Sequence, residues 1–414
     1  MKILFITDNF PPEVNAPATR TYEHCQEWIK NDVEVTVITC NPNFPHGKIY
    51  EGYQNKLYHK ENIDGIKVIR VWSYMSSNTG FSKRVLDYFS FALSSFFAGL
   101  FQKSDIIVAT SPQFFTTWSA FSLSKIKRKP WIFELRDIWP ESIQSVGAIK
   151  YKKVIDFLEK IELALYRDSK HVIAVTDAFK RNLIERGIFK EKISVVTNGS
   201  NIELFKTREQ DQALLNKLGL NEKFVFGYIG THGMAHSLDF IVRSISKVKD
   251  DNIHFLFIGN GAMKELIVKL SDQLNIKNIT FLDAISKEDV PKYLSVVDVS
   301  LAPLKKSETF KSVIPSKIFE ASAMRKPTLL GVEGEAKKIM TTYNAGLCFE
   351  PENEEDFIKK VYRLKNSRTE YIEFQVGCDR LSLDFDRKKL AQKMLTILEN
   401  NINKKSYTMI KSSV

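Results

Sequence analysis

Short apolar runs of strand length alternate along the chain with longer segments whose apolar residues recur at helical spacing. This alternation is typical of parallel βαβ units, and it occurs twice. In the first half we predict strands at residues 3–7, 33–39, 67–71, 105–109, 131–135, 171–175 and 194–196. In the second half we predict them at residues 224–229, 254–258, 279–282, 297–302 and 328–330. The pattern therefore predicts two parallel α/β domains, each with its own sheet.

The boundary between the two domains is predicted at an Asn-Gly turn signal in VVTNGSN, residues 195–201, just before a polar stretch. We place the hinge near Asn198 and assign residues 1–199 to the first domain and 200–385 to the second. Residues 386–401 predict a final amphipathic helix, and the basic tail that follows has little apolar surface to bury. We expect that tail to be frayed.

One segment, residues 85–101, is mostly apolar but, at about 17 residues, too short for a good transmembrane candidate. Its polar members fall on one helical stripe and leave a broad apolar arc; the stripe holds Asp87, Ser90, Ser94 and Ser95, and the arc includes Phe89, Phe96 and Phe97. Two interpretations stay open: a core helix packed on the sheet, or an interfacial helix on a membrane. The aromatic and then basic order of residues 114–129 favours an anionic membrane surface, although a solvated helix end has a similar composition.

Composition narrows the class of protein without identifying it. The 414 residues, 43% of them hydrophobic and 26% charged, predict a folded protein with more than one core. The four scattered cysteines predict reduced thiols, and the strand-like start MKILFIT without a cleavage site predicts a cytoplasmic protein. The net charge of +11 suits nucleic acid, anionic lipid or a phosphorylated small molecule, and charge alone does not choose among them.

The most informative stretch is IPSKIFEASAMRKPTLL, residues 314–330, in which Pro315 and Ser316 predict a helix start near Ser316. Free backbone N–H groups at a helix start, together with the charge of Lys317, form a site for a diphosphate. Glu320, one turn further on, can accept two hydrogen bonds from the hydroxyls of a ribose. Taken alone, this pattern is also that of an ordinary capped helix.

Residues 315–330 resemble the donor-binding segment of retaining GT-B glycosyltransferases of family 4, which includes bacterial O-antigen and capsule transferases. Further segments that match in order and spacing are PPEVNAPATR (11–20), FELRDIWPES (133–142), VTNGSN (196–201), GYIGTHGMAHSLD (227–239), IGNG (258–261) and VDVSLAPL (297–304). The resemblance implies a GT-B architecture, with two Rossmann-like domains whose parallel sheets face each other across a cleft. It also implies that the first domain binds the acceptor, the second binds the nucleotide sugar, and the segment 386–414 packs back on the first domain.

Residues 41–72 resemble the subgroup of N-acetyl-L-fucosamine transferases. This likeness implies transfer of N-acetyl-L-fucosamine, or a related N-acetylated sugar, from a UDP-sugar donor to a polyprenyl-diphosphate-linked saccharide. The reaction would belong to O-antigen or capsule synthesis, with the protein peripheral on the inner face of the cytoplasmic membrane and with no nucleic-acid partner.

The resemblance also implies donor-binding residues in the second domain. Gly230 opens a loop that approaches the diphosphate closely, and Thr231 and His236 stand where the family usually has an Arg and a Lys. We therefore expect Lys317, helped by a protonated His236, to stabilise the departing diphosphate, with Glu320 on the ribose.

The wall around the donor sugar departs from the family in one respect. Ser312 stands where a glutamate is usual, so we expect Ser312, Val313 and Ile314 to contact the sugar mainly through backbone groups, next to the helix start at Ser316. Gly259, Asn260 and Asp283 end two strands at the carboxyl edge, and Asp283 is expected near the base.

In the first domain, Asn15, Arg20, Arg136 and Asp137 follow predicted strands and are expected to face the cleft. The resemblance implies that Asp137 orients the acceptor hydroxyl, and a salt bridge with Arg136 or Arg20 is the alternative. Family members of this kind need no covalent nucleophile, because the leaving phosphate accepts the proton. The sequence contains no clear Asp-x-Asp pair or His/Cys cluster, so we expect neither a metal nor another cofactor.

Two other functions remain open. A sugar-nucleotide 2-epimerase shares the architecture but needs several acid–base groups, of which the sequence offers few candidates. A non-catalytic, membrane-associated module that binds a nucleotide sugar would tolerate the missing charge pair and Ser312.

Overall fold

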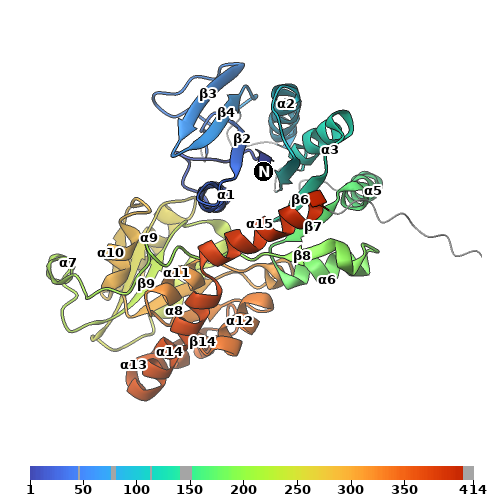
Figure 1. Ribbon diagram of the computed structural model, residues 1–414. Coiled ribbons are helices and arrows are strands. Elements are labelled where there is room, and N and C mark those ends of the chain that lie inside the picture. The colour runs from blue at the N-terminus through green and yellow to red at the C-terminus, as the bar shows by residue number, and fades with distance from the viewer. Residues whose placement is uncertain (45–46, 76–80, 112–113, 140–151, 404–414) are drawn as a thin grey trace, which may run out of the picture. The chain divides into compact units, whose positions relative to one another are not determined.

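The computed structural model describes residues 1–44, 47–75, 81–111, 114–139 and 152–403 (Figure 1). The chain forms two compact units, one of residues 1–197 with the segment from 388 onward, and one of residues 198–387. The boundaries expected at 199 and 385 lie within two residues of these divisions. The tail expected to be frayed lies almost wholly outside the described residues.

The first unit is built on a parallel sheet with the strand order β3-β4-β2-β1-β5-β6-β7-β8, in which only β3 and β4 pair antiparallel. Its strands are β1 (Lys2–Ile6), β2 (Glu34–Cys40), β3 (Tyr58–Ile63), β4 (Ile66–Val71), β5 (Ile106–Thr110), β6 (Trp131–Leu135), β7 (His171–Ala174) and β8 (Ile193–Val195). Its described helices are α1 (Ala16–Ile29), α2 (Phe81–Leu100), α3 (Thr116–Lys127), α5 (Lys152–Asp168), α6 (Asp177–Glu185), the short η1 (Lys190–Lys192) and α15 (Arg387–Asn403). The strands expected from the sequence are confirmed. They were predictable because central parallel strands are buried on both faces and form continuous apolar runs in the sequence.

Alternate side chains of β1 belong to two different cores. Leu4 and Ile6 lie in the core beneath α2, α3, α5 and α6, whereas Ile3 and Phe5 lie in the core beneath α1 and α15. This two-sided burial follows from the period of two along a strand. The sheet is thus the middle layer of three, and its carboxyl edge presents the loops that carry Asn15, Ser111 and Asp137.

The C-terminal helix α15 completes the first unit, as expected. Met394 and Leu398 are fully buried and pack in one core with residues of β1 and α1, and the indole Nε1 of Trp28 donates a hydrogen bond to the Ala391 carbonyl at 2.9 Å. Figure 1 shows this red helix beside the green strands of the same unit. The last helix therefore belongs to the core formed by the first strands.

The second unit contains a wholly parallel sheet with the order β11-β10-β9-β12-β13-β14. Its strands are β9 (Phe224–Ile229), β10 (Ile253–Ile258), β11 (Ile279–Leu282), β12 (Val299–Pro303), β13 (Thr328–Gly331) and β14 (Gly346–Cys348). Its helices are α7 (Gln212–Leu218), η2 (Met234–His236), α8 (Leu238–Ile245), α9 (Lys264–Gln273), α10 (Val290–Ser295), η3 (Thr309–Ser312), α11 (Lys317–Ala323), α12 (Glu335–Tyr343), α13 (Glu354–Asn366) and α14 (Arg368–Asp384). The helix predicted to start near Ser316 is α11.

Helix α2 covers the segment for which the sequence left two interpretations open. The polar stripe faces inward in part, because Ser90 and Ser95 are buried, while apolar residues that include Phe89 and Phe97 are exposed. No helix in the described ranges is long and apolar enough to cross a membrane. Apolar side chains lie on both faces, since Phe91 is fully buried in the core, so the helix is not one-sided. Each of the two interpretations left open by the sequence fits one face.

Because α15 fills the first unit's core, we predict that Leu398→Ala lowers the free energy of unfolding of this unit by about 2–5 kcal/mol, the cost of a buried leucine truncation. All five tryptophans lie between residues 28 and 139, so denaturation followed by tryptophan fluorescence reports this unit alone. The exposed neighbour Glu399 provides the control, and Glu399→Ala should change stability by less than about 0.5 kcal/mol. Equal effects of the two substitutions would contradict the assignment of α15 to this core.

Candidate active site

Three glycines of the second unit bring two loops into close contact at the carboxyl ends of β9 and β10. Gly230, Gly259 and Gly261 have φ values of +143°, +149° and +152°, which side chains rarely adopt. A Cβ at Gly259 would lie 1.9 Å from the Gly230 carbonyl oxygen, and a Cβ at Gly261 would lie 2.5 Å from the carbonyl oxygen of His232. Only glycine fits here, and the loops expose backbone to a ligand at the edge where nucleotides bind in such sheets.

Lys317, the first residue of α11, reaches back over this glycine loop. A Cβ at Gly230 would lie 2.5 Å from its ammonium nitrogen, which is 4.7 Å from the centre of the Tyr228 ring. Burial lowers the pKa of Lys317 to about 8; the Glu320 carboxylate opposes this shift and the Lys287 ammonium adds to it. The side chain is thus a poorly hydrated cation at a helix start, ready to be paired with an anion.

The protonated His236 expected from the sequence is not supported. Burial lowers the pKa of His236 to about 4, and the neighbouring charge of Lys317 acts in the same direction, against the carbonyl of Pro303. The imidazole is therefore neutral near pH 7 while the site holds no anion. Thr231 is exposed, and its carbonyl accepts a hydrogen bond from the Tyr228 hydroxyl at 2.6 Å.

A second histidine of this loop, His232, escaped the sequence analysis. It is fully buried, and neither ring nitrogen has a hydrogen-bond partner within the described part of the chain. Burial lowers its pKa to about 4, with the charges of Lys264 and Lys317 adding to the effect. The sequence contained a hint of this residue, because THGMAH (231–236) places two histidines four residues apart directly after Gly230. Only the fold shows that the first of them is buried.

Glu320 is paired in the structure. Its carboxylate forms a salt bridge with Lys287, which the sequence did not single out, and the Lys287 ammonium also lies 4.8 Å from the centre of the Phe205 ring. Glu320 and Lys317 lie within one turn of α11, so the helix places a carboxylate and an ammonium on neighbouring positions, as expected. A ribose bound to Glu320 would share that carboxylate with Lys287.

Asn260 and Asp283 lie at the ends of neighbouring strands. With its amide nitrogen turned towards acceptors, Asn260 donates to the Gly259 carbonyl at 2.9 Å and to Asp283 Oδ1 at 3.2 Å. Lys264 donates to the carbonyls of Gly259 at 3.0 Å and Leu282 at 2.5 Å, and burial lowers its pKa. Asp283 is exposed at this edge.

The segment before α11 has a fixed local conformation. The Ser312 hydroxyl donates to the Thr309 carbonyl at 2.9 Å within η3, and the N–H of Val313 donates to the Phe310 carbonyl at 3.2 Å. Ile314 turns its side chain into the core, so only its backbone is open to a ligand. The carbonyl of Ser316 accepts from the N–H of Phe319, which makes Ser316 the cap of α11 without a side-chain hydrogen bond.

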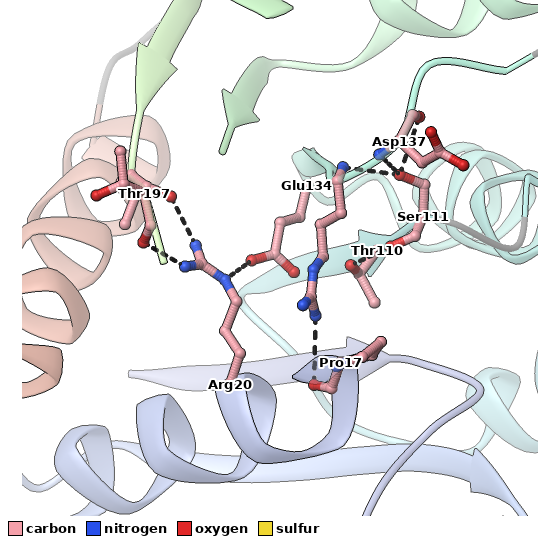
Figure 2. A network of polar contacts seen from close by, with 9 residues as sticks. Pro17, Arg20, Thr110, Ser111, Glu134, Asp137 and Thr197 are labelled. Carbon is pink, nitrogen blue, oxygen red and sulfur yellow. Dashed lines mark hydrogen bonds and ion pairs between the residues drawn. The ribbon is translucent and has the colours of Figure 1, made fainter. Parts of the chain in front are cut away.

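The predicted residues of the first unit divide into two groups (Figure 2). Arg20 is 1% exposed and does not face solvent: its guanidinium binds Glu134 Oε1 at 2.9 Å and the carbonyls of Val196 and Thr197 at 2.9 and 2.5 Å. Burial alone would raise the pKa of Glu134, but Arg20 and then Arg136 bring that pKa below its usual value. Arg20 therefore has a structural role, and its expected place facing a cleft is corrected.

Asp137 is held at the end of β6 by Ser111, which the sequence analysis missed. The Ser111 hydroxyl oxygen accepts hydrogen bonds from the backbone N–H groups of Arg136 at 2.8 Å and Asp137 at 3.2 Å. The Arg136 guanidinium donates to the Pro17 carbonyl at 3.3 Å, and Asn15 caps α1 by accepting from the Ala18 N–H at 2.9 Å. Asp137 remains partly exposed, so its carboxylate can reach a substrate.

Within the second unit the structure thus places Lys317 close to Gly230, which lies against Gly259, with Asn260 beside Asp283. In the first unit Asn15, Arg136 and Asp137 lie at one sheet edge. Among the described residues, no group of three or more His, Cys, Asp or Glu side chains is placed to hold a metal ion. The chemistry that these residues offer is charge stabilisation by lysine and backbone N–H groups, together with the carboxylates of Glu320 and Asp283 in the second unit and of Asp137 in the first.

Two parallel α/β units, the second with a glycine loop under a helix-start lysine, form the two-domain architecture of the GT-B fold. Residues 17–204 match the Glycosyltransferase Family 4 model, and residues 223–367 match the model of Glycosyl transferases group 1. The chain carries these two glycosyltransferase domains, one in each unit.

Relatives agree with this class. WcaI of Escherichia coli (strain K12), named for colanic acid biosynthesis, is 26% identical over 371 residues, covering 86% of this chain and 90% of WcaI. TuaH of Bacillus subtilis (strain 168), named for teichuronic acid biosynthesis, is 24% identical over 48% of this chain and 49% of TuaH.

Solved structures show the same fold. A sucrose-phosphate synthase from Thermosynechococcus elongatus superposes with a TM-score of 0.77 at 14% identity, over 96% of this chain and 98% of that one. Anabaena HepE in complex with UDP and glucose superposes with a TM-score of 0.72 at 16% identity, over 97% and 100%.

The pKa of Lys317 predicts how affinity for a nucleoside diphosphate depends on pH. A bound anion stabilises the protonated form of the lysine. The affinity for UDP should therefore be at its maximum below about pH 8 and should fall as the pH rises above that value, by up to about tenfold per pH unit. Isothermal titration calorimetry between about pH 7 and 9.5 measures this. Lys317→Arg keeps its charge throughout and should remove the dependence; an unchanged pH profile in that variant would contradict the role of Lys317.

Proposed function

We infer that this glycosyltransferase moves a sugar from a UDP-sugar to a lipid-linked saccharide, with retention of the anomeric configuration and without a metal ion. The observation that carries the proposal is the Lys317 ammonium held against the Gly230 loop at the start of α11. A cation and helix-start N–H groups at this position can stabilise the additional negative charge that develops on a departing nucleoside diphosphate. No acid–base group is needed on the leaving side, because the diphosphate leaves as an anion.

UDP is favoured as the nucleotide. HepE, which has the same fold, is described in complex with UDP and with UDP-glucose, and the Glu320 carboxylate lies one turn from Lys317, where a ribose can be bound through its hydroxyls. Asn260 and Asp283 at the neighbouring strand ends are proposed to contact the base. The amide groups and exposed carboxylate there can hydrogen-bond to a uracil edge.

The proposed reaction joins the acceptor oxygen to C1 of the donor sugar while the bond from C1 to the β-phosphate oxygen breaks. The acceptor proton passes to the departing phosphate oxygen on the same face of the sugar, so the step needs neither a covalent enzyme intermediate nor a separate base. Asp137 is proposed to orient the acceptor hydroxyl and to share the positive charge that develops there. Ser111 fixes the backbone that carries this carboxylate.

The acceptor is proposed to be a polyprenyl-diphosphate-linked saccharide at the inner face of the cytoplasmic membrane, in surface polysaccharide synthesis. The names of WcaI and TuaH support this class of pathway. For the donor sugar we propose N-acetyl-L-fucosamine or a related N-acetylated sugar. Ser312 and the backbone of Val313 and Ile314, in place of a second carboxylate, suit a less polar 6-deoxy sugar.

A nucleotide and donor panel tests the proposal. UDP should raise the apparent melting temperature more than GDP or ADP, and one UDP-sugar, with UDP-N-acetyl-L-fucosamine tested first, should raise it further. Lys317→Ala should weaken UDP binding about tenfold to a hundredfold, the loss expected for a charge-assisted hydrogen bond. Lys269→Ala on the exposed face of α9 is the matched control and should bind UDP as the unchanged protein does.

Product analysis separates the competing functions. Transfer to a polyprenyl-diphosphate saccharide should continue in a chelator and give the donor's anomeric configuration by nuclear magnetic resonance. Loss of turnover in the chelator would overturn metal independence, and an inverted product would overturn retention. An epimer formed from the donor alone would indicate an epimerase, and a lack of response to any nucleotide would indicate a non-catalytic module.

Asp137 gives a second test. Asp137→Asn keeps the size of the side chain and the Ser111 contacts, so transfer should fall about 10²- to 10⁴-fold while UDP affinity stays within about twofold. Rates of transfer and calorimetric Kd values for UDP measure the two effects. Asp156→Asn, on the exposed surface of α5, should leave both unchanged. Full transfer by Asp137→Asn would remove Asp137 from the mechanism.

A further inference from the structure

Helix α2 carries a continuous stripe of exposed apolar side chains. Leu86, Phe89, Leu93 and Phe97 are 50%, 48%, 50% and 54% exposed, and their spacing of three and four residues places them on one face. Phe101, four residues beyond Phe97, is 82% exposed. Scattered exposed apolar residues are ordinary, but four in a row on one helix, with a fifth just past its end, mark a surface that a membrane or another molecule covers.

The opposite face of α2 shows why the stripe points outward. Ser95 is fully buried and lies 2.9 Å from the hydroxyl of Ser119 in α3, and Ser90 accepts a hydrogen bond from the Tyr74 N–H at 2.7 Å. A Cβ at Gly99 would lie 2.4 Å from Leu123 Cδ1, so α3 packs directly on the α2 backbone at this point. The inward face is therefore already filled, by Phe91 in the core and by these small and polar groups, and the helix cannot turn to bury its exposed apolar residues without breaking these contacts.

The apolar surface continues onto the end of α3. Lys127 donates to the carbonyls of Leu100 and Gln102, both at 2.8 Å, and so ties the end of α3 to the end of α2. Ile126 beside it is 60% exposed. Phe101 and Ile126 thus extend the stripe at one end of the helix pair.

The charges around this surface are mostly positive. Residues 81–129 contain seven Lys and Arg and two Asp, a net charge of +5 (7 − 2) out of +11 for the whole chain. Lys103 and Arg128 are exposed near Phe101, whereas Lys125 pairs with Asp168, and Lys129 lies 3.9 Å from Asp105. An exposed apolar stripe with a basic border is complementary to a surface that is apolar below and anionic above.

We propose that the α2 stripe, defined as Leu86, Phe89, Leu93, Phe97 and Phe101, docks the protein on an anionic lipid bilayer, with Lys103 and Arg128 against the headgroups. The described helices are not suited to cross a membrane, so the helix lies in the plane of the interface. The inference rests on the proposed function only for its purpose, which is to hold the first unit beside a lipid-linked acceptor. The physical claim concerns lipid binding and stands apart from transfer.

Co-sedimentation with vesicles tests this surface. The full chain should bind vesicles of phosphatidylcholine with phosphatidylglycerol, bind less at high salt, and bind weakly to phosphatidylcholine alone. Leu93→Asp with Phe97→Asp should weaken binding at least about tenfold, because two half-exposed apolar groups are lost and two negative charges gained. Lys103→Glu should weaken binding to phosphatidylglycerol vesicles and leave binding to phosphatidylcholine unchanged.

The matched control is Ile372→Asp with Val376→Asp on α14 of the second unit. These residues are 47% and 49% exposed and four positions apart, so the control makes the same change at the same exposure away from α2. It should bind vesicles as the unchanged chain does. Equal loss in the control, or unchanged binding in the α2 variant, would overturn the proposal.

Two further measurements separate the alternatives. The α2 variant should still bind UDP by calorimetry, which would show that it is folded. If the unchanged chain binds vesicles but not UDP, the proposed function is overturned while the proposed docking surface stands. Sedimentation velocity without lipid gives the oligomeric state. A self-associated unchanged chain that the α2 variant turns into a monomer would show that a second copy covers the stripe, and would overturn lipid docking.

Discussion

The second unit is organised around a lysine whose ammonium is kept partly out of water. Lys317 lies over Gly230, and Gly230 in turn lies against Gly259, so the strand ends of β9 and β10 and the start of α11 fit together only with glycine at both positions. Burial of the ammonium disfavours its charge, which costs free energy in the empty protein. The same dehydration strengthens the attraction to an anion, because charges interact more strongly where water is excluded. An anion such as the proposed diphosphate would therefore be attracted more strongly here than by a fully hydrated lysine.

Most of the fold could be predicted from the sequence because parallel strands buried on both faces are apolar without interruption. The central strands of both sheets have this property, and a Pro-Ser start predicted α11. The edge strand β3, with the sequence YHKENI, was missed because its side chains are mostly exposed and polar. The short strand β14 was missed because its sequence, GLC, begins with glycine and is only partly buried. The sequence left the orientation of α2 open because apolar residues lie on both of its faces, and because Ser90 and Ser95 can be buried while they donate to backbone carbonyls of their own helix.

The positions of the candidate site residues were predictable from the sequence, but their burial and protonation were less so. Lys317, Glu320 and the glycines lie together because they belong to strand ends and a helix start of one sheet, which sequence order indicates. The charge of His236 could not be predicted, since it depends on burial and on Lys317, which is distant in sequence. Arg20 was misplaced for a similar reason: its partner Glu134 lies 114 residues away, on a buried strand where a carboxylate is unexpected.

The segment that joins the two units is fixed on both sides by buried arginines. Within the first unit, Arg20 donates to the carbonyls of Val196 and Thr197. Within the second unit, Arg387 donates to the carbonyl of Gly199. The backbone of Ser200 is held as well, by Phe385 at 3.1 Å and Arg387 at 2.9 Å. Carbonyls bound in this way resist rotation of their peptide groups, because a buried guanidinium left without its acceptor is costly. The carbonyls next to Asn198 are therefore held within their own units, and the glycine of the Asn-Gly pair, whose carbonyl is bound by Arg387, is one of the held residues. The chain passes between the units a second time at residues 387–388.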